Sequence, residues 1–585
     1  MAQRALVTAQ NQSKHRGTVS VKEALLHNGR SIANTYDAIG RITSRTLKYG
    51  STNILKTDLT YVSGANGSKT ALVSSLKNGN DSAYNYTYDA NGNITQIWRG
   101  SGTFSSASEK YSYVYDKANQ LIRENLYYGS GNTNNATYTY TYDEWGNLLE
   151  KNKYAYTTGT VGSVLDTVTY GYTDSEWGDK LTSYDGNTIT YDAMGNPTSY
   201  LGKTLTWEGK QLKTAARNVG ALTIQYSYEY DENGLRTNKT TTIQSSGPQT
   251  TEYYYNGSVL IGMRIDVGYA VKLLKFSYDA NGTAVAVDYS EDNGSTYTTY
   301  YYVRNAQNDV VKLIDGTGSA VVEYTYDTWG KILSVSGSLA TALGYDQPFR
   351  YRGYVYDNET QWYYLQSRYY DPTTCRFISA DVLLSTGQGV LGHNAFAYCL
   401  NNPVNMADEG GCRALPFATM MADTGKSGWN IVYYNVPVYN QGDSYLCWAF
   451  CQVMIESYNL GVTLTQQEAT NRAISIAKEV NGVNDWNKGG FPQYSAPLGI
   501  SINDIDSIYS LYQIIRDYGP MYAYYENTRN GNTHLVVVTG VDADNNIVYT
   551  NNPWGERGKQ TFEDFLTSIV WKNNLERIYR LKNIF

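Results

Sequence analysis

The stretch Tyr84-Asn-Tyr-Thr-Tyr-Asp-Ala-Asn-Gly-Asn-Ile-Thr-Gln-Ile97 indicates the fold of most of this chain. Tyrosine alternates with smaller polar residues up to Tyr88, a pattern typical of a β-strand with one packed face. An Asp-Ala-Asn-Gly turn and a second alternating segment follow. The stretch therefore predicts a β-hairpin in which Gly92 takes the positive φ that the turn requires. Tyrosine suits such strands because its ring packs while its hydroxyl stays near water.

The Tyr-Asp-x-x-Gly element at the centre of this hairpin recurs along the chain. Its copies begin at Tyr36, Tyr88, Tyr142, Tyr191, Tyr230, Tyr278 and Tyr326, with a degenerate copy at Tyr115-Asp-Lys-Ala-Asn119. Successive copies lie 52, 27, 27, 49, 39, 48 and 48 residues apart, so the larger steps indicate two units of which one is eroded. Self-similarity at this period predicts a repeat array of β-hairpins.

Composition excludes several classes of protein. The 585 residues carry a net charge of 47 − 54 = −7 without a long basic run, which argues against nucleic-acid binding. No apolar run of about 18 residues indicates a membrane span. The first 30 residues lack the apolar segment of a signal peptide, so we interpret the chain as the end of a longer protein or one exported by another route. Five cysteines are too few for a disulfide framework, and with four histidines a structural zinc site remains a minor alternative.

The region after the repeats carries more specific motifs. Tyr351-Arg-Gly-Tyr-Val-Tyr-Asp357, Trp362 to Pro372, Arg376-Phe-Ile-Ser379 and Asn394 to Asn405 follow one another in order. Together with the repeats they resemble the YD-repeat (RHS-repeat) family and its RHS-associated core. The resemblance implies a mainly β shell of spiralling hairpins, closed by the core region and followed by a variable effector domain that the shell can enclose.

Some members of that family cut themselves just after the core with aspartates, at an Asp-Pro-x-Gly element. Here the corresponding stretch is Asp408-Glu-Gly-Gly411, with Glu409 in the proline position, and a leucine follows at Leu415 before Pro416. Two carboxylates that share a proton would be able to perform this chemistry. The alternative is that Asp408 is a surface residue in a turn.

Beyond residue 412 the pattern changes to helices and buried strands. In Gln441-Gly-Asp-Ser-Tyr-Leu-Cys447, turn residues lead to a cysteine, and apolar residues then recur at helical spacing up to Gly461. Cys447 thus stands where a loop enters a helix, a position that stabilises a thiolate. Cys451, four residues later, fits a small buried hydrophobe.

A thiolate needs a base, and the sequence offers His534. It begins a strand of valines 87 residues after Cys447, and Asn552-Pro-Trp-Gly555 comes 18 residues later, after a predicted partner strand. The asparagine can hold the imidazole tautomer, and Gln441 can donate to an oxyanion. A capping box at Thr465-Gln-Gln-Glu468 predicts a helix to about Lys478.

The order Gln441, Cys447, His534, Asn552 resembles the papain-like cysteine peptidases, over roughly residues 430–575. The resemblance assigns Cys447 as nucleophile, His534 as general acid and base, Asn552 as orienting residue and Gln441 to the oxyanion hole. We therefore predict five segments: an N-terminal segment that is incomplete or leads into the shell, the repeat shell, the RHS-associated core, a linker and a small α+β papain-like domain. Their bounds are 1–30, 31–345, 346–411, 412–429 and 430–585.

Three functions fit this organisation. The leading prediction is a secreted or surface-displayed polymorphic toxin, delivered into a target cell, whose peptidase cleaves target proteins and which a cognate immunity protein restrains. The same Cys-His-Asn site would also suit a deamidase or acyltransferase. In the third, non-enzymatic alternative, the tyrosine-rich repeats contact cell surfaces or carbohydrate. No cofactor is expected for any of them.

Overall fold

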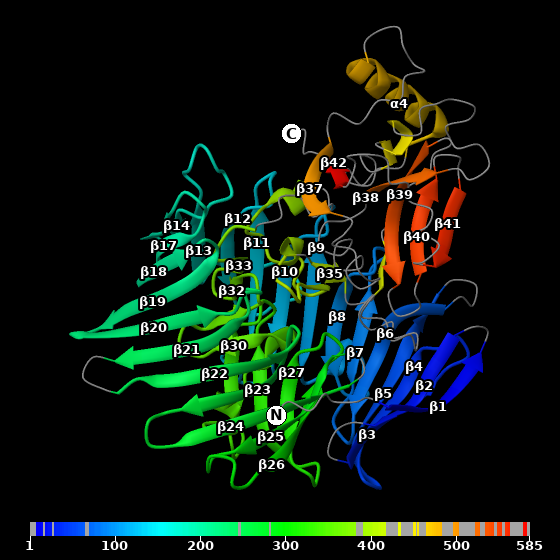
Figure 1. Cartoon of the computed structure of the whole chain (residues 1–585). Helices are drawn as coiled ribbons and strands as arrows, with labels where there is room; N and C mark the ends of the chain where they lie inside the picture. Colours follow the sequence, from blue (N-terminus) through cyan, green and yellow to red (C-terminus); the bar gives the residue numbers. More distant parts are fainter. Residues whose placement is uncertain are drawn as a thin grey trace. The chain divides into compact units, whose positions relative to one another are not determined.

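A computed structural model describes most of the first 416 residues and selected elements beyond them (Figure 1). The described residues are 8–15, 18–25, 29–64, 69–243, 247–279, 282–381, 390–412, 414–416, 431–433, 449–451, 453–454, 464–481, 495–501, 521–526, 533–542, 547–552, 556–561 and 577–581. The chain divides into two compact units, residues 1–384 with 394–426 and residues 385–393 with 427–585.

Two long antiparallel sheets make up most of the first unit, and in both of them each strand pairs with the next in the chain. Within the described residues, the first sheet has 15 strands and the second has 14. The strands of the first sheet are β1 (Thr8–His15), β2 (Thr18–Leu25), β3 (Arg30–Tyr36), β4 (Ile42–Tyr49), β5 (Thr52–Ser63), β6 (Lys69–Asn78), β7 (Tyr84–Tyr88), β8 (Ile94–Arg99), β9 (Lys110–Tyr115), β10 (Leu121–Tyr127), β11 (Ala136–Tyr142), β12 (Leu148–Tyr154), β13 (Asp166–Gly171), β14 (Ser183–Tyr184) and β15 (Asn187–Thr188).

The second sheet runs to the end of the repeats. Its strands are β16 (Thr190–Tyr191), β17 (Pro197–Tyr200), β18 (Lys203–Glu208), β19 (Gln211–Val219), β20 (Leu222–Tyr230), β21 (Arg236–Ile243), β22 (Gln249–Asn256), β23 (Val259–Asp266), β24 (Val271–Tyr278), β25 (Ala284–Ser290), β26 (Thr298–Arg304), β27 (Val310–Ile314), β28 (Ala320–Tyr326) and β29 (Ile332–Ser336). The predicted repeat of hairpins is confirmed. The first sheet also includes β1 and β2, upstream of the predicted start of the array at residue 31.

The predicted turn is confirmed in atomic detail at Tyr88-Asp-Ala-Asn-Gly92. The Asp89 carboxylate accepts the backbone N–H groups of Asn91 and Asn93, both at 2.9 Å, and Gly92 has φ +86°. The other described copies repeat this arrangement. In the degenerate copy, Asn119 takes the glycine position with φ +62°, a conformation that asparagine tolerates better than most residues.

The motif tyrosines correct the expectation that their hydroxyls stay near water. The Tyr88 hydroxyl donates to the backbone carbonyl of Val73 at 2.7 Å, and Tyr142 donates to Leu121 at 2.8 Å. Each bond ties a motif to the hairpin before it. Burial raises the pKa of Tyr142 well above its ordinary value, so this hydroxyl remains a donor at neutral pH.

The eroded copies predicted from the larger steps are present as hairpins without the full motif. Tyr61, in the first 52-residue step, donates its hydroxyl to Ile42 at 2.7 Å. Trp207 replaces a tyrosine in another step and donates its indole N–H to Pro197, also at 2.7 Å. The ring-to-carbonyl bond therefore persists where the Asp-x-x-Gly turn has been lost.

The described residues between 343 and 416 form short elements; η5 belongs to the second unit, and elements of the first unit pack against both long sheets. One hydrophobic cluster contains buried side chains from the first sheet, from the second sheet and from this core region. The elements are α1 (Leu343–Asp346), η4 (Tyr351–Gly353), β30 (Val355–Asp357), β31 (Trp362–Tyr364), β32 (Tyr369–Asp371), β33 (Arg376–Phe377), η5 (Val390–His393), η6 (Cys399–Asn401), β34 (Met406–Ala407) and β35 (Leu415–Pro416), and a further short helix, η3 (Phe104–Ser106), follows β8.

Asparagines of the core region bind the repeat turns one after another. The side-chain amides of Asn402, Asn401 and Asn394 donate to Asn93, Gln120 and Asn147 at 3.0, 2.9 and 2.9 Å. Each acceptor is the residue directly after the turn glycine or its substitute, and each also donates to the aspartate of its own turn. The core region thus recognises the turns of the first sheet through a row of amides.

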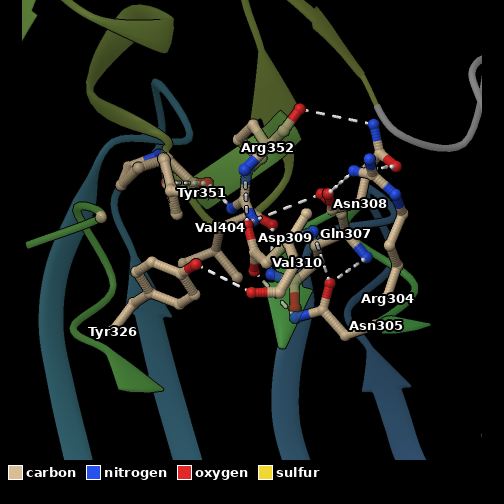
Figure 2. A network of polar contacts seen from close by, with 12 residues as sticks. Arg304, Asn305, Gln307, Asn308, Asp309, Val310, Tyr326, Tyr351, Arg352 and Val404 are labelled. Carbon is tan, nitrogen blue, oxygen red and sulfur yellow. Dashed lines mark hydrogen bonds and ion pairs between the residues drawn. The ribbon is translucent and has the colours of Figure 1, made fainter. Parts of the chain in front are cut away.

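A buried polar network joins the core region to the second sheet (Figure 2). The Arg352 guanidinium donates to Asp309 at 2.7 Å, and its backbone N–H reaches the same oxygen at 2.9 Å. Gln307 donates to the carbonyl of Val404 at 3.0 Å. Removing one partner of such a desolvated pair leaves an uncompensated buried charge, so the network specifies how the core region docks.

The second unit contains an antiparallel sheet and a helix. The sheet order is β37-β42-β38-β39-β40-β41, with β36 paired to β39. The elements are β36 (Ile431–Tyr433), α4 (Gln466–Asn481), β37 (Ser495–Ser501), β38 (Met521–Glu526), β39 (Thr533–Asp542), β40 (Ile547–Asn552), β41 (Glu556–Thr561) and β42 (Arg577–Leu581). A mainly β repeat region followed by a small α+β unit confirms the predicted fold class.

Candidate functional site

The helix predicted after Cys447 is present where the structure describes it. Residues 449–451 and 453–454 are helical, and Phe450, Cys451 and Val453 are at most 1% exposed. Cys451 is fully buried, as expected of a small core residue. Gln441 and Cys447 themselves lie outside the described residues.

The strands predicted around the histidine are confirmed. His534 is the second residue of β39, and Asn552 is the last residue of β40. The two strands are antiparallel neighbours. Their centre is fully buried, with Val537, Val541 and Val548 at 0% exposure, so the two positions belong to a packed sheet.

The register distinguishes between two adjacent asparagines. Asn551 pairs with Val537, so the next step along the ladder brings Asn552 opposite Val536. Residues opposite one another in an antiparallel pair share a face, and so do residues two apart in one strand. Asn552 and His534 therefore occupy positions on one face of the sheet, and Asn551 occupies the other.

The helix predicted from the capping box is also confirmed. The Thr465 hydroxyl accepts the backbone N–H of Glu468 at 3.3 Å, and the Glu468 carboxylate accepts the Thr465 backbone N–H at 2.8 Å. This contact starts α4, which extends three residues beyond the predicted end at Lys478. The spacing of apolar residues at 502–518 and 562–571 also predicts helices, and these two stretches lie outside the described residues.

A second site lies in the first unit, at the stretch considered for self-cleavage. Asp408 is 2% exposed, so the interpretation as a surface aspartate is wrong, although it does accept the backbone N–H of Cys412 at 3.0 Å as a turn residue would. The Arg368 guanidinium lies 3.6 Å from Asp408 and 2.8 Å from Asp381. Arg368 and Asp381 are also buried, at 6% and 9% exposure. Two carboxylates thus share one desolvated cation.

The residues after Asp408 are held in place by the same arginine. The Gly411 carbonyl accepts a hydrogen bond from Arg368, and Gly411 has φ +75°. A Cβ at this glycine would stand 2.6 Å from the Ser367 hydroxyl, so no larger residue fits. Leu415 lies in β35, paired with Ala407, and is 43% exposed.

Sequence reasoning missed Asp381 and Arg368 as parts of this site. Asp381 follows the core motif Arg376-Phe-Ile-Ser379 by two residues, and a second carboxylate was expected without being located. The pairing is invisible in the sequence because Arg368, Asp381 and Asp408 are brought together only by the packing of the core region. In the part of the chain that the structure describes, no group of three His, Cys, Asp or Glu residues is arranged to hold a metal ion. No helix among these residues is long and apolar enough to cross a membrane.

Comparison with known families confirms both resemblances drawn from the sequence. Residues 18–176 and 270–401 match the teneurin YD-shell family. Residues 428–569 match the family described as papain-like cysteine protease AvrRpt2. The chain therefore combines a YD shell with a C-terminal region of the papain-like protease type.

Curated relatives share only part of their length with this chain. The tRNA nuclease WapA of Bacillus subtilis is 35% identical over 233 residues, which are 40% of this chain and 9% of WapA. The tRNA3(Ser)-specific nuclease WapA of Bacillus spizizenii is 34% identical over 244 residues, again 40% and 9%. The putative uncharacterized protein YlbH of Escherichia coli is 34% identical over 116 residues, 18% of this chain and 47% of YlbH. The chain thus spans less than a tenth of either nuclease.

Solved structures share the fold at low identity. The crystal structure of TcdB2-TccC3-Cdc42 aligns with a TM-score of 0.50 and 20% identity, over 70% of this chain and 21% of that one. The Tc holotoxin pore of Photorhabdus luminescens aligns with a TM-score of 0.50 and 19% identity, over 68% and 21%. These alignments show a common fold.

Proposed function

We propose that this chain is an RHS-type bacterial polymorphic toxin whose C-terminal region is a papain-like cysteine peptidase that cleaves proteins of a target cell. The observation that carries the proposal is the match of residues 428–569 to a papain-like protease family. Cys447, His534 and Asn552 occur within it in the order that such a site needs. The positions of His534 and Asn552 on one sheet face support the pairing of an imidazole with its orienting amide.

The proposed reaction proceeds through a thioester. The Cys447 thiolate attacks the scissile carbonyl carbon, and Gln441 together with the Cys447 backbone N–H stabilises the oxyanion. His534 gives its proton to the departing amine and then takes one from the water that hydrolyses the thioester. Asn552 accepts the other ring N–H and so holds the tautomer.

Delivery and restraint belong to the same proposal. The chain would be secreted or displayed at the cell surface, with the shell making contact with the target cell. A cognate immunity protein would block the peptidase in the producing cell. The WapA relatives are named as tRNA nucleases, and we do not extend that activity to this chain because it matches only 9% of their length.

The test incubates the full chain with cytosol of a susceptible bacterium and sequences new protein N-termini. We expect new termini with the wild type and with Cys451→Ala, a control at the next cysteine in the sequence, and none with Cys447→Ala. Intact tRNA in the same samples excludes the nuclease alternative. Conversion of glutamine to glutamate without new termini would replace the peptidase by the deamidase, and equal results for Cys447→Ala and wild type would refute a thiol site.

A second candidate function, self-cleavage in the region of Asp408, Gly411 and Leu415, is favoured by the buried Arg368 with its two aspartates. One carboxylate would take a proton from water as it attacks the peptide carbonyl, and the other would protonate the departing amide nitrogen. Arg368 would hold both groups in place. Such a cut would separate the shell from the peptidase.

Intact mass measurement of the purified full chain tests this second function. We expect two fragments from the wild type and from the control Asp58→Asn, whose side chain is half-exposed and lies far along the chain from Asp408. Asp408→Asn and Asp381→Asn should each leave one uncut chain. An uncut wild type, or fragments that persist in both variants, would contradict it.

A further inference from the structure

The peptide bond between Gly411 and Cys412 is in contact with a buried charged side chain on each side. The Gly411 carbonyl accepts a hydrogen bond from the Arg368 guanidinium, and the Cys412 backbone N–H donates to the Asp408 carboxylate at 3.0 Å. Arg368 is 6% exposed and Asp408 is 2% exposed. A desolvated cation on a carbonyl oxygen polarises the carbonyl and stabilises negative charge that develops there during nucleophilic attack.

The Cys412 thiol supplies a nucleophile beside this bond. Its Sγ donates to the Ser367 hydroxyl at 3.2 Å, and that hydroxyl donates to the Gly410 carbonyl at 2.6 Å. These two bonds hold the thiol against the segment that leads into the polarised peptide. A thiol on the residue directly after a carbonyl reaches the carbonyl carbon through a five-membered ring, and Gly411 has no side chain to hinder that approach.

We propose that the chain cuts itself at the Gly411–Cys412 bond, with the Cys412 thiol as nucleophile. The inference rests on the self-cleavage proposed above and replaces water by the thiol in the first step. Sulfur bonds to the Gly411 carbonyl carbon while Arg368 stabilises the oxyanion. The C–N bond then breaks, and the thiol proton ends on the Cys412 nitrogen, which leaves a thioester between Gly411 and the cysteine sulfur. Water hydrolyses the thioester, gives the Gly411 carboxylate and returns a proton to the sulfur.

The charges around the thiol fit this order of events. Burial raises the pKa of Cys412 to about 11, with further increases from Asp381 and Asp408 and an opposing effect of Arg368. The thiol therefore keeps its proton at neutral pH, and this is the proton that the departing nitrogen needs. Asp408 contacts the Cys412 N–H and is placed to carry the proton from sulfur to nitrogen. Attack within one residue offsets the small thiolate fraction, because well-oriented intramolecular reactions reach effective concentrations of about 10⁵–10⁸ M.

The test measures the intact masses of the purified full chain, kept at neutral pH with and without hydroxylamine. We expect a wild-type fragment that ends at Gly411 and a second that begins with Cys412. Hydroxylamine should convert the new end at Gly411 from an acid to a hydroxamate, because it attacks thioesters far faster than peptide bonds. Cys412→Ala should lose the cut. Cys375→Ala, which removes a buried thiol of the same unit, should be cut like the wild type.

The outcomes separate failure of this inference from failure of the proposed self-cleavage. A wild-type chain that stays whole under both conditions would contradict the self-cleavage itself. Fragments that persist in Cys412→Ala, a cut at another bond, or a cut at Gly411 without a hydroxamate would overturn the role of the thiol alone. Should Cys412→Ala lose its cooperative thermal transition, Cys412→Ser takes its place, since a hydroxyl keeps the hydrogen bonds but attacks more slowly. Slower cutting of Cys412→Ser then supports the thiol, and the wild-type rate overturns it.

Discussion

Trp145 and Trp329 stand at the same position of the same turn motif, yet one is exposed and the other is buried. In both turns the motif aspartate accepts the tryptophan backbone N–H, at 2.9 Å from Asp143 and 3.0 Å from Asp327. Trp145 is 62% exposed, whereas Trp329 is fully buried. The local hydrogen bonds are therefore the same, and they do not decide where the ring lies.

Contacts from elsewhere in the chain account for the difference. The Trp329 indole donates to the Tyr140 hydroxyl at 3.0 Å, and Tyr140 donates to the buried Glu124 carboxylate at 2.6 Å. Three core-region tyrosines also donate to the backbone carbonyls of this turn, namely Tyr351 to Thr328, Tyr370 to Trp329 and Tyr363 to Gly330. The Trp145 backbone instead accepts from Asn394 at 3.3 Å. Contacts with the core region thus bury the turn of Trp329, while the turn of Trp145 keeps its ring exposed.

The largest difference between the two turns should appear when each tryptophan ring is removed in turn. Trp329→Ala leaves a large cavity and removes the indole N–H that donates to the Tyr140 hydroxyl, so we expect it to lower the free energy of unfolding by about 3–5 kcal/mol. Trp145→Ala should change it by less than about 0.5 kcal/mol, as is usual at exposed positions. Denaturant unfolding of both variants measures the difference, and equal losses would show that exposure does not distinguish the two turns.

The turn glycines offer a smaller contrast. Gly330 and Gly92 have similar φ values of +92° and +86°, but an added Cβ would stand 2.6 Å from the Tyr351 ring at Gly330 and meet nothing within 4 Å at Gly92. Gly92→Ala should therefore cost about 1–2 kcal/mol from backbone strain alone. Gly330→Ala should cost about 1–3 kcal/mol more because the site is overpacked. Equal unfolding midpoints for the two variants would contradict the contact with Tyr351.

These contrasts separate what the sequence could predict from what it could not. The hairpins, the turn glycines and the eroded copies follow from local patterns, because alternation and turn chemistry act over a few residues. The burial of Trp329 depends on partners far along the chain, such as Tyr140, and the hydroxyls of the motif tyrosines bond to carbonyls of the preceding hairpin. No short-range pattern carries that information.

The same division applies to the candidate sites. The strands of His534 and Asn552 could be predicted because one contains a run of valines and the other begins with Ile-Val-Tyr. The register that sets His534 and Asn552 on one face could not, since it depends on how two separate strands align. Likewise Asp408 was found from its motif, whereas its shared partner Arg368 required the folded core region.

The buried carboxylate of Glu124, which is connected to Trp329 through the Tyr140 hydroxyl, makes the stability of the protein depend on pH. Burial raises the pKa of Glu124, with opposing contributions from Lys151 and from the hydrogen bond of Tyr140. A raised folded-state pKa adds stability below the unfolded value, near 4.3, and this stability is lost as the pH rises through the folded value. Glu124→Gln should therefore gain stability relative to the wild type between pH 4 and pH 8. Urea midpoints across this range measure the gain, and the exposed control Glu150→Gln should show no comparable trend.

The motif tyrosines should give the smallest effects, and equal ones in the two turns. Tyr142 and Tyr326 precede the exposed and the buried tryptophan, and both donate their hydroxyls to backbone carbonyls, of Leu121 and Val310, at 2.8 Å. Removing either hydroxyl by substitution with phenylalanine should cost about 1 kcal/mol, the usual value of such a bond. The two losses should agree within about 0.5 kcal/mol, because the core region does not alter this contact.

Tyr254→Phe serves as the exposed control for these two variants, since its hydroxyl donates to the surface residue Glu252 and its ring is 46% exposed. Its unfolding midpoint should stay close to that of the wild type. A loss for Tyr326→Phe much larger than for Tyr142→Phe would mean that the core region also strengthens the bond between successive hairpins. Equal losses would place the whole difference between the two turns in the contacts of Trp329 and Gly330.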